Sequence, residues 1–588
     1  MLIFSAILFI LFFSYHAVLI NRSITGLQRC CSALFLSIIT VTYAPQISSA
    51  IFATLNIWVL LVVSVAPPLF LFLIQRKSLS SVWTKAYFEL NLGLGYAFAR
   101  ELLRSWYIIA LAGLTIAATV FASWLLANFS NFGWDGWAYH SSAMAWFSQQ
   151  DRITGSMPLM SWITSYPKNI EFLSLWIKHL SGNDQFIEAA NLIVHLFVIP
   201  FAYGIARHCN LSKHWAAAAA LIYFLTPEII SQSWSTLIDG AFSDSLVILL
   251  FLSFSWHSCA RDEQLFWSVL LGLGLGHVMH SKGSGLYVLV IVGFLLLARV
   301  FLEKDTHRLR TRLLIVGIFA ALSGGGWYLK NWLVYGNPVY PFQLTLPGTA
   351  IILFSGRSLE QLVEPSGSGN YRDFSPLWLY LSHFAGISAQ AGWGSHFFFL
   401  GLPAMVVTIF RNRNLTWLVL FAIAYFVMIP FSFEARYSLV PCVAGAIAFG
   451  YMSQEILNTK GWQCALRAVS VFTITVSLVA VLPMLGDQNR NISDIDFARR
   501  DGFKRFGLVR ETPGVRVAIV NLGFGADNPY WYFYFGPKWE NRVEIFDPQQ
   551  VSAYDYVVCD FSATNCPSLS SHSLALLEKT VAVYRKDG

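Results

Sequence analysis

Long apolar segments separated by short polar ones dominate the chain. A helix needs about 20 apolar residues to cross the hydrocarbon core of a bilayer, and on this rule the sequence predicts about 14 spans. The first segment, Leu2–Ile20, has no basic stretch before it and no small-residue cleavage site after it, so we expect it to be retained as a span. The predicted spans are Leu2–Ile20, Cys31–Ala44, Ala50–Ile74, Trp106–Phe129, Phe186–Ala206, Trp215–Ile230, Ala241–Cys259, Leu265–His280, Ser284–Val300, Leu313–Leu329, Phe397–Phe410, Leu415–Pro430, Leu439–Met452 and Trp462–Leu485.

The composition agrees with a membrane protein. The 588 residues are 56% hydrophobic and only 12% charged, whereas about a quarter of the residues of a soluble domain are charged. The formal net charge of +7 does not indicate a nucleic-acid partner, because Lys and Arg lie mostly in short loops, where they set the orientation in the membrane.

Basic residues divide the loops into two sets. The basic loops, which include Arg76, Lys77, Arg308 and Arg310, are predicted to be cytoplasmic by the positive-inside rule. The opposite, outer side then carries two loops, residues 130–185 and 331–395, that are long for connections and are expected to be functional. It also carries the turns at Asp239, Lys282 and Glu434–Arg436, and the C-terminal tail.

The pattern changes near residue 487. We predict N-terminal spans and a cytoplasmic loop over 1–105, a transmembrane catalytic core over 106–486 and a small periplasmic α/β domain over 487–588. Cys559 and Cys566 in this domain can form a disulfide outside the cytoplasm, or remain two free thiols. The elements predicted in the domain are strands at Val515–Val520, Arg542–Phe546, Tyr554–Asp560 and Thr580–Tyr584, and a helix at Ser571–Glu578.

Asp135 is the first candidate for chemistry. It lies in Trp134-Asp135-Gly136-Trp137-Ala138-Tyr139-His140, at the outer mouth of a span. A carboxylate there is costly unless a ligand, a cation or a reaction requires it. It can deprotonate a hydroxyl group or hold a divalent cation. The alternative is an ordinary Asp-Gly turn, and the neighbouring Tyr139 and His140, candidate substrate-binding residues, favour function.

Further carboxylates lie on the same side. Glu171 and Lys168, a candidate substrate-binding residue three positions earlier, begin a segment with helical spacing of apolar residues, which is predicted to be an interfacial helix. Glu171 is a candidate partner of Asp135, or only a favourable charge at a helix N-terminus. Asp239 is a second candidate cation ligand, with Asp244 a weaker site candidate, and the alternative for both is a helix cap.

Three basic residues occupy outer turns. His280 and Lys282, both candidate substrate-binding residues, lie in a glycine-rich junction between two predicted spans, where a lysine can reach an anionic lipid phosphate. Arg436 lies in the turn with Glu434, and its guanidinium suits a phosphate. The alternatives are snorkelling for Lys282 and simple pairing with Glu434 for Arg436.

These motifs together resemble the GT-C superfamily of membrane glycosyltransferases, in particular bacterial relatives of the protein O-mannosyltransferases and of the lipid A aminoarabinose transferases. The resemblance covers about residues 106–485. Asp135 is followed by Gly136, whereas the protein mannosyltransferases have adjacent Asp-Glu. The matching motifs are Trp134-Asp135 through Tyr139-His140, Tyr166-Pro167 with Glu171, Leu237-Ile238-Asp239, Lys282, Lys330-Asn331-Trp332 with Tyr335-Gly336-Asn337-Pro338-Val339-Tyr340-Pro341-Phe342, and Ala435-Arg436-Tyr437.

The resemblance implies an inner-membrane enzyme that moves a sugar from a polyprenyl-phosphate donor to a glycan, lipid or protein acceptor on the periplasmic face. Asp135 would match the family's loop carboxylate, with a divalent cation as a candidate cofactor at Asp135 and Asp239. Lys282 and Arg436 would handle the lipid phosphate. Two alternatives remain: a transporter or flippase of lipid-linked glycans, and a polysaccharide polymerase or ligase.

Overall fold

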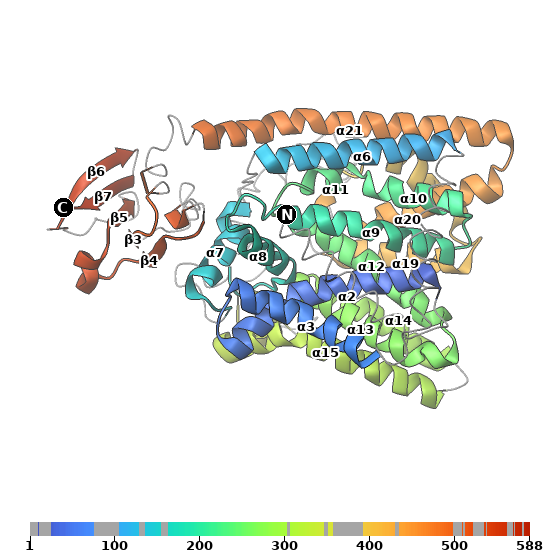
Figure 1. Ribbon diagram of the computed structural model, residues 1–588. Helices are drawn as coiled ribbons and strands as arrows, with labels where there is room; N and C mark the ends of the chain where they lie inside the picture. Colours follow the sequence, from blue (N-terminus) through green and yellow to red (C-terminus); the bar gives the residue numbers. More distant parts are fainter. Residues whose placement is uncertain are drawn as a thin grey trace.

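The computed structural model is a helical bundle joined to a small C-terminal sheet (Figure 1). It describes residues 10, 25–75, 105–128, 136–153, 163–302, 306–345, 351–356, 392–429, 434–497, 508–509, 512–520, 534–536, 538–560, 569, 571–578 and 581–587. The predicted span Leu2–Ile20 lies outside these residues apart from Ile10.

The bundle is built from helices that fall where the apolar segments predict them. α10 shows why: Ser212 caps its first turn by accepting from the Trp215 amide, an alanine-rich run follows, and the helix ends just before Pro227. The helices of the bundle are α2 (Gly26–Ile47), α3 (Ile57–Gln75), α6 (Trp106–Asn128), α9 (Ala189–His208), α10 (Lys213–Phe224), α11 (Pro227–Gln232), α12 (Asp239–Ser258), α13 (Gln264–Ser281), α14 (Gly285–Leu302), α15 (Thr306–Tyr335), α18 (Leu402–Thr408), α19 (Arg413–Met428), α20 (Val440–Tyr451) and α21 (Lys460–Phe497).

Two predicted spans are interrupted. Ala50–Ile74 is broken between the π-helical turn Ser48–Phe52 and α3, where Ala53 adopts a left-handed conformation. Trp215–Ile230 is divided into α10 and α11, because Pro227 cannot continue the hydrogen bonding of α10.

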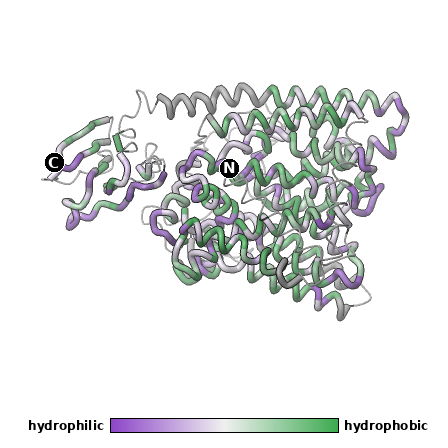
Figure 2. The backbone as a smooth tube through the Cα atoms, in the orientation of Figure 1, coloured by the Kyte–Doolittle hydropathy of each residue, from purple (hydrophilic) through white to green (hydrophobic). Residues whose placement is uncertain are grey.

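The apolar character of the helices supports a multi-pass membrane protein. Among the described residues, six helices are long and apolar enough to cross a membrane, and further apolar helices are shorter. Figure 2 shows the hydrophobic stretches running through the bundle helices, with hydrophilic residues gathered towards their ends. The predicted polytopic helical bundle is confirmed, and the small C-terminal domain, predicted to be α/β, is a sheet domain.

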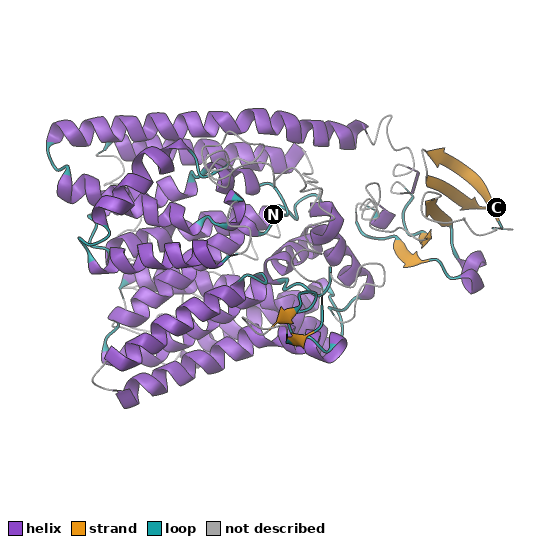
Figure 3. Cartoon of the chain, turned by 180° about the vertical axis from the view of Figure 1, so that it is seen from behind, coloured by secondary structure: helices purple, strands orange, loops and turns teal. Residues whose placement is uncertain are grey.

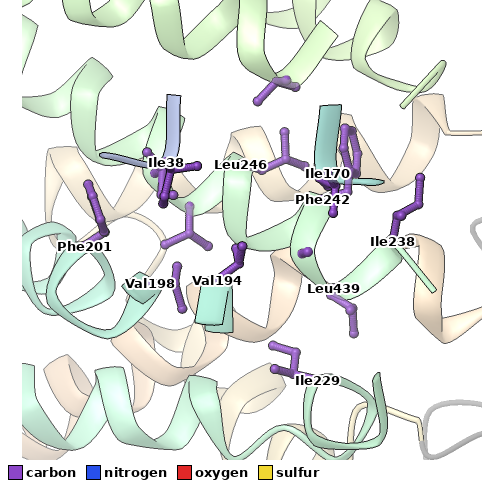
Figure 4. Close-up of a cluster of buried hydrophobic side chains, with 14 of the residues drawn as sticks. Ile38, Ile170, Val194, Val198, Phe201, Ile229, Ile238, Phe242, Leu246 and Leu439 are labelled. Carbon is purple, nitrogen blue, oxygen red and sulfur yellow. The ribbon is translucent and has the colours of Figure 1, made fainter. Parts of the chain in front are cut away.

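Buried side chains from helices far apart in the sequence form the centre of the bundle. Figure 4 shows Ile38 of α2, Val194 and Phe201 of α9, and Phe242 and Leu246 of α12 packed in one cluster. Each is at most 4% exposed. The core therefore fixes α12 between its neighbours, and with it the residues at the start of that helix.

The first outer loop folds back onto the bundle as two helices, α7 (Ser141–Gln150) and α8 (Asn169–Ser181). The predicted helix at Glu171 is confirmed as α8, but nearly all of its residues are buried, polar ones included. In the second outer loop, β1 (Leu344–Thr345) and β2 (Ile352–Phe354) form a short antiparallel pair.

The C-terminal domain contains a five-stranded mixed sheet in the order β4-β3-β5-β7-β6. β3 is parallel to β4 and β5, and β7 is antiparallel to β5 and β6. Figure 3 shows the sheet beside the bundle, on the side to which α21 leads. The strands are β3 (Arg516–Val520), β4 (Arg542–Ile545), β5 (Tyr556–Asp560), β6 (His572–Glu578) and β7 (Val581–Lys586).

The predicted helix at Ser571–Glu578 is wrong, because this segment is strand β6. Its Leu, Ala and Glu residues favour a helix in isolation. In the structure it pairs with β7 from His572 opposite Lys586 to Glu578 opposite Val581. Tertiary pairing therefore overrides the local propensity. Cys559 is disulfide-bonded, and its predicted partner Cys566 lies outside the described residues.

The sheet domain contacts the first outer loop directly. The side-chain amide of Gln149 in α7 donates to the Val543 carbonyl at 3.0 Å and accepts from the Val543 amide at 2.7 Å. Lys178 of α8 lies 4.7 Å from the ring centroid of Trp539. Gln149 therefore pairs with the edge strand β4 as another strand would.

We predict that Gly276→Ala destabilises the bundle by about 1–3 kcal/mol, the usual cost of overpacking a core. An added Cβ on Gly276 of α13 would lie 2.7 Å from the Ala320 carbonyl oxygen and 2.8 Å from the Gly324 nitrogen of α15. Gly325→Ala on α15 is the control, since nothing lies within 4 Å of its added Cβ. Thermal unfolding in detergent measures both, and an equal effect would contradict the prediction.

Candidate functional site

Three helix ends bring Asp239, Lys282 and Arg436 together. Asp239 begins α12, Lys282 follows the last residue of α13, and Arg436 lies in the 3-10 turn Ala435–Tyr437. Lys282 Nζ donates to Asp239 Oδ1, and Arg436 Nε lies 3.9 Å from Asp239 Oδ2. The sequence places these residues on one side of the membrane, and the structure brings them into one cluster.

An aromatic ring and a second carboxylate complete this cluster. Lys282 Nζ lies 4.1 Å, and the Arg436 guanidinium 4.7 Å, from the centroid of the Tyr437 ring. Arg436 donates to the Tyr437 hydroxyl and, through Nε, to Glu434, both at 2.9 Å. The Asp239 side chain is 6% exposed, against 23% for Lys282 and 19% for Arg436. Lys282, Arg436 and Glu434, whose side chain is 16% exposed, are therefore the accessible part of the cluster.

A buried carboxylate, Glu228, is linked to the cluster through Gln232. Glu228 of α11 accepts from Gln232 Nε2 at 2.9 Å and from the Gly392 amide at 3.1 Å. Gln232 Oε1 in turn accepts from the Gly240 amide at 2.6 Å, next to Asp239. The sequence spacing of Glu228, Gln232, Gly240 and Gly392 did not indicate these hydrogen bonds, because the four residues lie in three separate segments.

His140, Lys168 and Glu171 form a second cluster. Glu171 Oε1 accepts from His140 Nδ1 at 2.8 Å and from Lys168 Nζ at 2.9 Å, and all three side chains are at most 4% exposed. Burial raises the pKa of the Glu171 carboxyl group, but the charge of Lys168 and the hydrogen bond from His140 outweigh it and lower that pKa to about 2.

The loop that carries Lys168 is held by the end of α15. Trp327 Nε1 and Asn331 Nδ2 donate to the Ser165 carbonyl at 2.7 and 2.8 Å, and Lys330 Nζ donates to the Thr164 carbonyl at 2.8 Å. The Lys330-Asn331 motif in the sequence thus positions the loop before α8. The rings of Tyr139 and Tyr166 lie 5.8 and 6.0 Å from Lys168 Nζ.

His280 belongs to neither cluster. It is 2% exposed, its Nδ1 lies 3.2 Å from the Ser323 carbonyl oxygen, and its ring packs against Tyr43, Phe172 and Trp327. It therefore lies between α2, α8 and α15. Asp135 lies outside the described residues, directly before the π-helical turn Gly136–His140.

Residues 106–323 match the family model for dolichyl-phosphate-mannose-protein mannosyltransferase. This match includes Asp239, Lys282 and the whole second cluster. The matched residues fall within residues 106–485, the region whose motifs resemble the GT-C superfamily, and the match agrees with that resemblance.

Solved structures with a similar arrangement include ArnT from Cupriavidus metallidurans in the apo state (13% identity, 80% of this chain and 97% of that one, TM-score 0.49). The same protein bound to undecaprenyl phosphate gives 14% identity, 81% and 97% coverage and a TM-score of 0.48. The Archaeoglobus fulgidus oligosaccharyltransferase in the apo form gives 14% identity, 76% and 70% coverage and a TM-score of 0.42. No curated protein sequence matches the chain.

We predict that Glu171 stabilises the fold in a pH-dependent way. Its pKa is lower in the folded protein, about 2, than in the unfolded chain, about 4.3. The stabilisation is therefore fully present above about pH 4.3 and is lost as the pH falls towards 2. Thermal unfolding of the wild type and Glu171→Gln between pH 2.5 and 7 tests this prediction. If the difference in thermal stability between the wild type and Glu171→Gln does not shrink at low pH, the prediction is contradicted.

Proposed function

We propose that the chain transfers a sugar from a polyprenyl-phosphate donor to an acceptor on the periplasmic face of the inner membrane. The observation that carries the proposal is the meeting of Lys282 and Arg436 at Asp239. Two half-buried cations from different helix ends form a site for an anion at one end of the bundle. The match to a family named for a dolichyl-phosphate sugar supports a lipid phosphate as that anion.

The residues around the cations suit a departing phosphate. Guanidinium and ammonium groups stabilise charge that develops on phosphate oxygens, and they act more strongly where water is partly excluded. In the free protein Asp239 and Glu434 balance their charge. Phosphate oxygens would share Lys282 and Arg436 with these carboxylates.

The transfer needs one further group. The acceptor hydroxyl oxygen forms a bond to the anomeric carbon of the sugar, and the bond from that carbon to the phosphate oxygen breaks. The hydroxyl proton passes to a carboxylate, and the polyprenyl phosphate leaves with one more negative charge. We assign the proton-accepting role to Asp135, next to the turn that carries Tyr139 and His140. The sealed Glu171 cluster then acts as the frame of this loop.

A divalent cation does not fit at Asp239. Two cationic side chains already face its carboxylate. Among the described parts of the chain, no group of three or more His, Cys, Asp or Glu side chains could hold a metal ion. The proposed transfer therefore uses no metal at Asp239.

The site favours transfer over transport. A transporter binds its substrate near the middle of the membrane, at broken helices, whereas Asp239, Lys282 and Arg436 lie at helix ends. The Asp244–His195 pair does lie within the bundle, but both side chains are fully buried. A polymerase or ligase would also use outer cations, and it would not require Asp135.

Asp135→Asn is expected to abolish transfer, because an amide cannot accept the hydroxyl proton. A panel of radiolabelled polyprenyl-phosphate sugars in membranes, with wild type and variant compared at equal folded amounts, measures it. Equal transfer in both would remove Asp135 from the mechanism. If the wild type transfers sugar from no donor, the transporter and polymerase alternatives gain support.

Lys282→Ala and Arg436→Ala are each expected to lower kcat/KM by about 100-fold, the usual cost of one group that stabilises developing charge. Arg413→Ala is the matched control, because Arg413 begins α19 at the opposite end of that helix from the Arg436 turn. The control should stay within about twofold, since surface substitutions are usually near neutral. Wild-type rates in both site variants would exclude the cations from the reaction.

A further inference from the structure

Two polar residues on α9 face the segment that leads into α12. Asn191 and His195 are four positions apart, so they lie on one face of the helix. They are 2% and 0% exposed, and α9 packs along α12. The proposed reaction does not use either residue directly, so their burial inside an apolar bundle requires another explanation.

Asn191 binds the chain just before α12. Its Nδ2 donates to the carbonyl oxygens of Gln232 at 3.2 Å and Ser235 at 2.7 Å, and to that of Leu237. Buried carbonyl groups are costly without a partner. The one amide therefore fixes the irregular segment that ends at Asp239.

His195 binds α12 itself, five residues beyond Asp239. Its Nδ1 is hydrogen-bonded to Asp244 Oδ2, and the Tyr223 hydroxyl of α10 donates to Asp244 Oδ1 at 2.9 Å. All three side chains are completely buried. A buried carboxylate without its partners is strongly unfavourable, so this contact holds α9, α10 and α12 in one arrangement.

The His195 ring also lies against the residue next to Asp239. An added Cβ on Gly240 would lie 2.9 Å from His195 Cε1 and 3.2 Å from Gln232 Oε1. The Gly240 amide already donates to that same Gln232 oxygen. The first turn of α12 is thus held at Gly240 and at Asp244, with Asp239 at its end.

We propose that Asn191, His195 and Asp244 are positioning residues that hold the first turn of α12, so that the Asp239 carboxylate meets Lys282 and Arg436. The consequence for sugar transfer rests on the function proposed above. The placement of Asp239 against Lys282 does not, and it can be measured without any substrate.

The test compares the two ends of the contact between α9 and α12. His195→Ala removes the hydrogen bond to Asp244 at the end near Asp239. His208→Ala is the matched control: His208 is also on α9, its ring lies 5.9 Å from that of Phe254, and its Nε2 lies 3.5 Å from Ser255 Oγ, at the far end of α12. A merely structural role predicts the same result from both variants at equal loss of thermal stability.

The readout is the rate at which an N-hydroxysuccinimide ester acylates Lys282 in the purified full-length protein, measured by peptide mass spectrometry. Asp239→Asn gives the rate for a Lys282 that has lost its charged partner. We expect His195→Ala to raise the acylation rate of Lys282 about fivefold, close to the rate in Asp239→Asn. A fivefold change corresponds to the loss of one partly exposed ion pair. His208→Ala should stay within about twofold of the wild type. Equal rates in the two histidine variants would overturn the proposal.

A second pair of variants tests the proposal if the His195→Ala protein does not fold. Gly240→Ala places a methyl group against the His195 ring, and Gly204→Ala places one against Phe251 at the other end of the same contact. Faster labelling in Gly240→Ala alone supports positioning, and equal labelling overturns it. Because no substrate is present, either result leaves the proposed sugar transfer to be judged by its own assay.

Discussion

The charge balance around Asp239 is the constraint on which this end of the bundle depends. A carboxylate that is 6% exposed needs cations, and Lys282 and Arg436 supply them from two other helix ends. The start of α12, the end of α13 and the Arg436 turn must therefore meet for the Asp239 charge to be balanced. The same convergence leaves two cations partly exposed at one point, which is the property an anion-binding site requires. The charge balance at this end and the phosphate binding proposed for it would thus have one physical origin.

The second cluster is buried and exposes no charge to a ligand. His140, Lys168 and Glu171 neutralise one another in a nearly dry interior, so none of them is available to a ligand in this arrangement. They tie η4 (Gly136–His140) to the start of α8, while the sheet domain holds α7 through Gln149. Two parts of the first outer loop, η4 with α7 and the start of α8, are thereby held in place. Asp135 directly precedes η4 in the sequence.

Hydropathy predicted the helices because burial in a bilayer depends on runs of apolar residues, which a sequence displays directly. It also placed Asp239, Lys282 and Arg436 on one side, because loop charge alternates along the chain. It could not predict that Lys168 and His140 share Glu171, since pairing across a loop depends on three-dimensional approach. His195 was missed for a related reason: a single histidine within an apolar segment carries no periodic signal. At β6, local propensity indicated a helix, and pairing with β7 decided otherwise.

The two kinds of polar residue in the bundle differ in their freedom to move. Asp239 is a short side chain on the first turn of α12, which Asn191 and His195 hold from the α9 side. Lys282 and Arg436 have long side chains at the exposed edge. A phosphate would therefore be accommodated by movement of the cations, with the carboxylate staying in place. Under the proposed function, the cations would return to the same ion pairs once the lipid phosphate leaves, because the bundle holds Asp239 in place.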